Sequence, residues 1–389
     1  MQDIKEKKPN QVSKQDYNLY ALISGVLITL LLFTVAILSL TGEKRDYSEN
    51  ENRYLAGKPS ISISGIKDGK FMKDTESYLS DQFFMRDKLV CTRTNIDIFL
   101  GKREINKIYV GRRHFLFEKP AVYDEERIAK TTANMNQVAK HNPKIRHYAA
   151  IAPNATEIIT RFLPPFAPTQ NQTQQIEQVY AKLEGMTTVD LCAALKSAEK
   201  PQKLYYKTDH HWTTQAAGIA FEEIAKAMKL NTKPYKINYL PVTNSFQGTL
   251  ASSSGIFNAN DTVYIPVTEP EVNYTVNFVE ENKTRTTVFD SSKLYEKSKY
   301  DVFFGGNFAE VKMESAAQSD RVLMVIKDSY ANCLVPMLIP YFKTIVMVDL
   351  RYYNDSLQQE IEKEGVTDIL WLYNADTFLN DSSINAKLS

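Results

Sequence analysis

The sequence predicts an α/β protein, a three-layer α/β/α sandwich with a mostly parallel sheet, preceded by one membrane-spanning helix. From about residue 121 onward, short apolar runs follow segments with helical spacing, as in parallel strands joined by helices. Residues 233–320 are instead rich in Thr, Val, Tyr and turn residues, which predicts a β-rich insertion of antiparallel strands. Residues 19–40 form an uncharged run of 22 residues, which predicts the single transmembrane helix.

The apolar run at residues 19–40 is long enough to span a bilayer. A secretory signal has a shorter apolar core and a small-x-small cleavage site, whereas this run leads into TGEKRDYSENENR. We therefore expect an uncleaved anchor, with a signal peptide of unusually long core as the alternative. Four basic residues flank the run on each side, so charge alone does not determine its orientation.

The next segment, residues 41–120, is expected to be a membrane-proximal stalk. A polar, turn-rich stretch is followed by one helical pattern at about residues 72–100. The sequence IYVGRRHFLF, residues 108–117, alternates around a glycine like a β-hairpin. Residues 121–389 then form the α/β domain, with buried strands expected at 148–153, 321–326, 344–350 and 367–373.

The overall composition excludes two classes of protein. Lys and Arg number 47 against 46 Asp and Glu, so the formal net charge of +1 does not favour nucleic acid as a partner. Three widely spaced cysteines, Cys91, Cys192 and Cys333, are too few for a disulfide framework or a metal knuckle. With 43% hydrophobic residues, the chain can bury a large core.

The stretch RVLMVIKDSYANCLVPML contains a candidate nucleophile. An apolar run of strand length ends at Lys327, and the residues from Ser329 onward have helical spacing. Ser329 is therefore expected at the carboxyl end of a buried parallel strand, where a strand-to-helix turn can present a hydroxyl beside a free backbone N–H. The alternative is that Ser329 only caps the following helix.

The stretch TDHHWTTQAAG contains the other parts that an activated serine needs. A serine hydroxyl reacts well only when a base takes its proton, and an imidazole does this best when a carboxylate orients it. Asp209 and His211 have a spacing that lets one loop present both, just before a helix expected to start at Thr213 or Thr214. His210 would then point elsewhere, and Trp212 would pack under the turn.

Other chemistries that use two adjacent histidines fit this sequence less well. Dimetal phosphoesterases also need aspartates in D-x-D spacing, which the chain lacks, and palmitoyltransferases need a cysteine where Trp212 stands. The remaining histidines, His114, His141 and His147, stand in unrelated contexts, so no metal site and no cofactor are expected. A purely structural role for the paired histidines remains an alternative.

Several motifs together resemble a known family, the bacterial DHHW proteins. They are YYKTDHHWT, IKDSYANCLVP, VDLRYY, GTLASSSGIF, SENENRYLAGKP and DQFFMRDKL, and the resemblance covers about residues 45–375. DHHW proteins are similar in turn to the SGNH-hydrolase-like domains of alginate O-acetylation proteins. The resemblance implies that Ser329 is the nucleophile, His211 the general base and Asp209 its orienter, whereas His210 is dispensable because that position varies in the related domains.

Five further residues are weaker candidates for binding an oxyanion or the substrate: Gly306, Asn307, Tyr330, Asn332 and Arg351. The sequence FFGGN places Gly306 and Asn307 in a loop that can approach an oxyanion, and Arg351 follows the strand next to Ser329. For each, a turn, an ion pair or a place on a helix surface is an equally good interpretation. Cys333 is expected to be packed rather than reactive.

Three functions follow as competing hypotheses. The first is an extracytoplasmic, membrane-anchored O-acyltransferase that acetylates a cell-surface or exported polysaccharide through an acyl-serine. The resemblance implies a polytopic membrane-bound O-acyltransferase as partner and a cytoplasmic tail at residues 1–18. The second is a carbohydrate esterase with the same three residues. The third is a non-catalytic glycan-binding or scaffold protein of an acylation complex.

Overall fold

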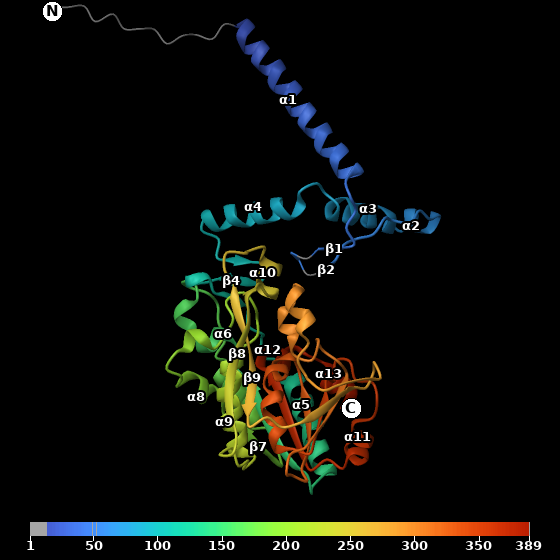
Figure 1. The fold of residues 1–389 in the computed structure, drawn as a ribbon. Coiled ribbons are helices and arrows are strands. Elements are labelled where there is room, and N and C mark those ends of the chain that lie inside the picture. The colour runs from blue at the N-terminus through green and yellow to red at the C-terminus, as the bar shows by residue number, and fades with distance from the viewer. Residues whose placement is uncertain (1–13, 49, 52, 389) are drawn as a thin grey trace, which may run out of the picture. The chain divides into compact units, whose positions relative to one another are not determined.

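The computed structural model describes residues 14–48, 50–51 and 53–388 (Figure 1). Of the expected tail at residues 1–18, residues 1–13 lie outside the described part of the chain. The chain divides into two compact units, Met1–Arg93 and Thr94–Ser389. The second unit thus begins before residue 121, because the hairpin at residues 108–118 packs on it: Ile108 and Leu116 share an apolar cluster with Leu250.

The first unit contains α1 (Lys14–Thr41), which matches the predicted anchor. Within it, Tyr17–Thr41 has a mean hydropathy of 2.7 and no buried residues in its most apolar window. Among the described residues this is the one helix long and apolar enough to cross a membrane. The remaining elements of the unit are β1 (Tyr47–Ser48), β2 (Arg53–Tyr54), α2 (Ile63–Lys67), α3 (Lys70–Asp81) and the start of α4 (Arg86–Phe99).

The prediction of a single helix at about residues 72–100 is wrong in one respect, because the structure has two helices there. The chain leaves the helical conformation after α3 (Lys70–Asp81) and resumes it in α4 (Arg86–Phe99). Between them Met85 has a positive φ of 55°, which is incompatible with a continuous right-handed helix. Apolar periodicity alone did not reveal this break.

The second unit is built on an eight-stranded sheet with the order β11-β10-β12-β14-β13-β15-β6-β7. Strands β14, β13, β15, β6 and β7 are parallel, and β12, β10 and β11 extend one edge in antiparallel pairing. The predicted α/β class with a mostly parallel sheet is therefore confirmed. The strand bounds are β6 (Arg146–Ala152), β7 (Met186–Val189), β10 (Tyr274–Phe278), β11 (Lys283–Arg285), β12 (Glu310–Ser315), β13 (Val322–Lys327), β14 (Thr344–Val348) and β15 (Asp368–Asn374).

The central strands are apolar on both sides because both faces of the sheet are covered. Along β13, Leu323 and Val325 belong to one buried core, whereas Met324 and Ile326 belong to a second core on the opposite face. Residues of α9 (Thr214–Ala227) and of the 3-10 turns after β13 contribute to the first core. The second core contains residues of α5 (Glu125–His141), α7 (Gln172–Tyr180), α11 (Leu357–Glu364) and α12 (Ala375–Asn380). The sheet thus lies between two helical layers.

The helices of this unit are short or of moderate length. The α-helices are α5 (Glu125–His141), α6 (Ala155–Ile158), α7 (Gln172–Tyr180), α8 (Leu191–Lys196), α9 (Thr214–Ala227), α10 (Thr249–Ser254), α11 (Leu357–Glu364), α12 (Ala375–Asn380) and α13 (Ser383–Leu388). The 3-10 turns are η1 (Arg112–His114), η2 (Thr160–Phe162), η3 (Pro201–Lys203), η4 (Ser291–Tyr295), η5 (Lys299–Val302), η6 (Ser329–Cys333) and η7 (Val335–Tyr341).

Two small antiparallel sheets complete the unit. One comprises β3 (Glu104–Ile105), β4 (Ile108–Val110) and β5 (Leu116–Glu118), and it contains the hairpin expected from IYVGRRHFLF. The other pairs β8 (Lys236–Phe246) with β9 (Asp261–Glu269). The strand-rich range 233–320 thus contributes both this pair and the three antiparallel strands of the main sheet, so it is partly an extension of that sheet.

Candidate active site

The turn after β13 presents Ser329 at the carboxyl end of a central strand. The side chain of Asp328 accepts hydrogen bonds from the backbone N–H of Tyr330 (2.9 Å) and of Asn374 (2.8 Å). Asp328 is therefore the residue that caps the following turn, and the Ser329 hydroxyl is not used for capping. Ser329 itself is half-buried, with part of its surface open to solvent.

The segment after Ser329 is not the α-helix that the spacing predicts. It forms two consecutive 3-10 turns, η6 and η7, and Pro336 and Pro340 lie within η7. A proline has no backbone N–H to donate, so a regular α-helix is disfavoured here. Cys333 is fully buried in this segment, and burial raises the pKa of its thiol to about 12, in agreement with a packed rather than reactive residue.

The loop that carries Asp209 and His211 is closed at its base. Tyr205 and Trp212 form an antiparallel bridge, and the N–H of Thr213 donates to the carbonyl of Leu204 (2.9 Å). Helix α9 follows at once, with Thr213 as its N-cap, as the sequence predicts. The loop is thus a short, closed hairpin that holds its polar side chains in fixed directions.

The structure brings Asp209, His211 and Ser329 together in one line. His211 Nδ1 lies 2.6 Å from Asp209 Oδ1, and His211 Nε2 lies 2.8 Å from Ser329 Oγ. Because a carboxylate only accepts, Nδ1 carries the proton, and Nε2 is left with a lone pair toward the serine hydroxyl. This geometry suits removal of the hydroxyl proton.

The Asp209 carboxylate is buried but fully hydrogen-bonded. Its Oδ1 also accepts from the backbone N–H of His211 (2.9 Å), and its Oδ2 accepts from the N–H (2.8 Å) and hydroxyl (3.1 Å) of Thr249. Burial raises the pKa of Asp209, but the interactions with His210 and His211, including the two hydrogen bonds from His211, outweigh it and hold the pKa well below its usual range. The carboxylate therefore stays ionised opposite the imidazole.

Several residues that hold Asp209, His211 and Ser329 in place were not identified from the sequence. The ring of Tyr300 stacks on His211 with centroids 3.8 Å apart, and its hydroxyl donates to the carbonyl of Ser329 (3.1 Å). Asp261 accepts from the N–H groups of Lys207 and Thr208, both at 2.9 Å. These residues come from η5 and β9, and no local motif marks them, because their roles depend on contacts between distant segments.

Two residues named from the sequence connect the histidine loop to the serine turn. Trp212 is fully buried, and its Nε1–H donates to the carbonyl of Tyr330 (3.0 Å). The hydroxyl of Tyr330 donates in return to the carbonyl of His210 (2.6 Å). Trp212 thus packs under the turn as expected, whereas Tyr330, a weak candidate for substrate binding, has its hydroxyl engaged in this connection.

The other weak candidates form a network beside the serine turn. Lys327 is buried, and its ammonium lies 2.9 Å from Asn332 Oδ1 and 3.5 Å from Asn307 Oδ1. It also lies 3.5 Å from Asp349, which Arg351 holds through two hydrogen bonds of 2.8 and 2.6 Å. Burial lowers the pKa of Lys327, although the Asp349 charge opposes this. Because both hydrogen bonds of its guanidinium go to Asp349, Arg351 is directed to that carboxylate.

Gly306 and Asn307 lie in a turn at the edge of this network. Gly306 has a φ of 130°, which L side chains rarely adopt, so a glycine is required there. Asn307 is exposed, and its Oδ1 accepts from Asn332 Nδ2 (3.1 Å). The Nδ2 of Asn307 has no hydrogen-bond partner within the part of the chain that the structure describes, so it remains available as a donor.

The second histidine lies beside the first but is not directed to Ser329. The rings of His210 and His211 have centroids 3.9 Å apart, and His210 Nδ1 lies 2.8 Å from the Thr249 hydroxyl. Asp209, His210 and His211 offer three ligand atoms within 4.8 Å of one another, a set that a metal ion can use. In the observed geometry, however, both Nδ1 atoms are committed to hydrogen bonds with Asp209 and Thr249.

The fold and this site define a class: α/β proteins in which an imidazole joins a carboxylate to a serine hydroxyl at the carboxyl end of a parallel strand. More particularly, the chain belongs to the DHHW protein family, whose model matches residues 114–348. The four residues of the family's name are Asp209 to Trp212 of this chain. The resemblance predicted from the sequence motifs is thus confirmed.

Solved structures with a similar fold include two bacterial proteins. A DHHW family protein from Eubacterium siraeum is 22% identical with a TM-score of 0.62, and the match covers 73% of this chain and 96% of that one. Bacillus cereus PatB1, solved with a sulfonyl adduct, is 19% identical with a TM-score of 0.60, covering 72% of this chain and 97% of PatB1. At these identities the likeness concerns the fold.

A curated relative is described as a probable alginate O-acetylase, AlgJ, from Pseudomonas putida. It is 22% identical over 220 residues, which cover 49% of this chain. The match spans 57% of the length of AlgJ.

Proposed function

We propose that this protein is a membrane-anchored, extracytoplasmic O-acyltransferase that moves an acetyl group onto a hydroxyl of a cell-surface or exported polysaccharide. The observation that carries the proposal is the hydrogen-bonded line from Asp209 through His211 to Ser329. The relationship to a probable alginate O-acetylase supports both the acetyl group and the polysaccharide. The SGNH-like character of the domain remains part of the proposal.

The first half of the reaction would form an acyl-serine. Ser329 Oγ attacks the carbonyl carbon of the acetyl donor while His211 Nε2 takes the hydroxyl proton, 2.8 Å away. Asp209 stabilises the imidazolium that forms. The C–O bond to the donor's leaving group then breaks, and His211 returns its proton to that group.

The second half would repeat these steps with the acceptor. His211 takes the proton of a sugar hydroxyl, whose oxygen attacks the acetyl carbon of the acyl-serine. The ester bond to Ser329 breaks, and His211 returns the proton to Ser329 Oγ. Water in place of the sugar would give the esterase reaction with the same residues.

We propose two donors for the negative charge that develops on the acetyl oxygen. The backbone N–H of Ser329 has no hydrogen-bond partner among the described residues. Asn307 Nδ2 is the second, because only the oxygen of that amide is engaged. Donors fixed before the reaction stabilise such charge without reorganising.

The anchor would place this chemistry at a membrane surface. Helix α1 is our proposed bilayer contact, with the second unit on the extracytoplasmic side. An acetyl donor on that side must be exported, so a polytopic membrane-bound O-acyltransferase is the partner we propose to supply it. The acceptor is the polysaccharide itself.

The test uses the full-length protein in detergent micelles with p-nitrophenyl acetate and a polysaccharide-derived oligosaccharide. We expect Ser329→Ala to lower acetyl transfer by at least about a thousandfold, because the nucleophile is absent. Ser197→Ala, which removes an exposed hydroxyl at the end of α8, is the matched control and should retain activity. Unimpaired transfer by Ser329→Ala would refute the proposed nucleophile.

The same assay separates transfer from hydrolysis. Release of p-nitrophenol that rises with added oligosaccharide, together with an acetylated product, supports transfer. Hydrolysis at the full rate without any acceptor favours an esterase. A protein that releases no p-nitrophenol in either condition fits a non-catalytic role.

A further inference from the structure

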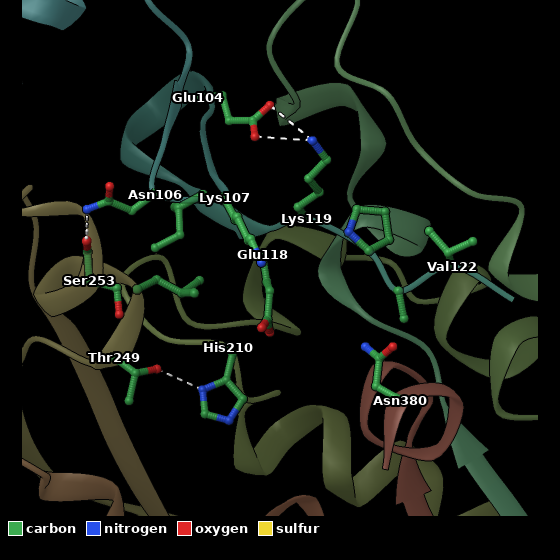
Figure 2. A pocket seen from close by; sticks show the side chains of 14 residues that line it. Glu104, Asn106, Lys107, Glu118, Lys119, Val122, His210, Thr249, Ser253 and Asn380 are labelled. Carbon is green, nitrogen blue, oxygen red and sulfur yellow. Dashed lines mark hydrogen bonds and ion pairs between the residues drawn. The ribbon is translucent and has the colours of Figure 1, made fainter. Parts of the chain in front are cut away.

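A cavity of about 800 Å³ lies beside the candidate active site, within the second unit (Figure 2). It lies between the small sheet that contains β3, β4 and β5, the start of α10 and the histidine loop. Its floor is apolar and buried, with Ile108, Ala121 and Leu250. Its rim is mostly polar and also includes the exposed Val122; the polar rim residues are Glu104, Asn106, Lys107, Glu118, Lys119, His210, Thr249, Ser253 and Asn380.

The charges of the rim balance. Two carboxylates, Glu104 and Glu118, face two ammonium groups, Lys107 and Lys119. Glu104 and Lys119 pair with each other at 3.2 Å. Lys107 and Glu118 form no ion pair or side-chain hydrogen bond within the described part of the chain. One free cation and one free anion therefore line the same cavity.

His210 connects this cavity to the proposed chemistry. Thr249 has one hydroxyl proton, which goes to the ionised Asp209 Oδ2 at 3.1 Å. His210 Nδ1 therefore donates to the Thr249 oxygen at 2.8 Å, and Nε2 retains its lone pair. Burial and the neighbouring His211 lower the pKa of His210, in agreement with a neutral ring. Figure 2 shows Glu118 directed toward this ring.

The backbone at Lys107 is strained. Asn106 and Lys107 form the two-residue turn between β3 and β4, and their φ angles are 51° and 64°. Such a turn favours asparagine and glycine, and a lysine in the left-handed region costs stability. A strained residue that directs an unpaired charge toward a cavity is a candidate for a functional group.

From these observations we infer that the cavity is the acceptor subsite and that its ligand is a neutral, polyhydroxylated chain such as an uncharged oligosaccharide. This inference rests on the proposed function. Sugar hydroxyls both donate and accept, so they can bond both Lys107 and Glu118, while the C–H face of a sugar contacts the apolar floor. A polyuronate carries a carboxylate on every residue, whereas this rim offers one unpaired ammonium, Lys107, with the unpaired Glu118 beside it.

Binding is measured by isothermal titration calorimetry on full-length Ser329→Ala in detergent micelles, so that no chemistry occurs. The probes are neutral hexasaccharides of glucose, xylose and mannose, and a hexauronate of equal length. We expect at least one neutral probe to bind more tightly than the hexauronate. Tighter binding of the hexauronate, or no binding of any neutral probe, would overturn the inference.

The residue assignment is tested with three further variants. Lys107→Gly and Glu118→Gln should each weaken binding of the neutral probe about tenfold, the effect of losing one charge-assisted hydrogen bond. Lys229→Gly is the matched control, because Lys229 is also an exposed lysine with positive φ, 54°, and lies outside the cavity. Both glycine variants should retain or raise the thermal midpoint, but only Lys107→Gly should weaken binding.

The two proposals fail separately. Binding of a neutral hexasaccharide by a protein that shows no acetyl transfer would refute the proposed function and leave the cavity as an oligosaccharide-binding site without the acceptor role. Unchanged affinity in Lys107→Gly and Glu118→Gln would refute the subsite even if Ser329→Ala abolishes transfer.

Discussion

At the scale of single residues, both oxygens of Asp209 are in use, and this determines the state of the neighbouring groups. Oδ1 orients His211, and Oδ2 binds Thr249, which in turn binds His210. Both histidines therefore depend on one carboxylate: His211 bonds Oδ1 directly, whereas His210 Nδ1 lies 3.5 Å from Oδ1 and bonds Thr249, which Oδ2 holds. This arrangement explains how one loop directs one ring to the serine and the other to the cavity.

Gly248 provides the space that this carboxylate needs. Its φ is ordinary, but a Cβ added at Gly248 would overlap the Asp209 carboxyl group. We predict that Gly248→Ala displaces Asp209 and lowers acetyl transfer about a hundredfold, the cost of misplacing a catalytic group by about 1 Å. Steady-state kinetics should show the loss in kcat rather than in KM.

Gly57→Ala is the control for this prediction. Gly57 is exposed in the first unit, and nothing lies within 4 Å of an added Cβ. The acetyl-transfer activity of Gly57→Ala should equal that of the unmodified protein. If Gly248→Ala kept full activity, the close packing around Asp209 would have no catalytic significance.

At the scale of elements, the antiparallel edge of the sheet packs against α11 through a buried acid. Glu310 is the first residue of β12 and is only 6% exposed. Burial, followed by the charge of Glu360 on α11, raises the pKa of Glu310 to about 7. The folded protein therefore holds a proton there that the unfolded chain releases at a lower pH.

This shift predicts a pH dependence of stability. Below about pH 4.5 both states are protonated at this group, and between pH 4.5 and 7 only the folded state is, so stability falls as the pH rises through this window. Glu310→Gln cannot release a proton, so we expect it to raise the thermal midpoint at pH 8 relative to the unmodified protein. Thermal unfolding followed by circular dichroism at pH 5 and pH 8 measures this.

The matched variant is Glu314→Gln on the same strand, whose side chain is 62% exposed. It should leave the difference between the two pH values unchanged. Asp301 and Asp376 also have raised pKa values, about 6 and about 7. Their contribution to the pH dependence of stability is the same in the unmodified protein and in both variants. A pH dependence in Glu310→Gln identical to that of the unmodified chain would contradict the prediction.

At the scale of the whole molecule, the proposed function requires the second unit to lie on the extracytoplasmic side of the membrane. Phe166 in this unit is fully exposed, whereas Cys192 and Cys333 are buried and Cys91 is half-buried. We predict that Phe166→Cys, in a chain with Cys91→Ser, reacts with a membrane-impermeant maleimide on intact cells. Labelling only after permeabilisation would show the opposite orientation.

Much of the fold could be predicted because its strands are local, strongly apolar runs. The runs expected at residues 148–153, 321–326, 344–350 and 367–373 correspond to β6, β13, β14 and β15. The break between α3 and α4 at Met85 and the 3-10 turns after Ser329 could not be predicted. Apolar periodicity does not reveal a single residue with left-handed backbone or the backbone N–H groups that prolines lack. The antiparallel edge was identified as strands but not as part of the main sheet, since pairing partners are non-local.

By itself, the sequence determined the helix and strand pattern, the long apolar segment, the family, and the short-range pair of Asp209 and His211. These features depend on neighbours in the chain, where side-chain spacing is set by covalent geometry. Only the tertiary structure decided that His211 meets Ser329, 118 residues away, and that Gly248, Thr249, Tyr300 and His210 surround the pair. Such contacts form when two faces of one sheet are buried, and no local pattern encodes which distant residues then come together.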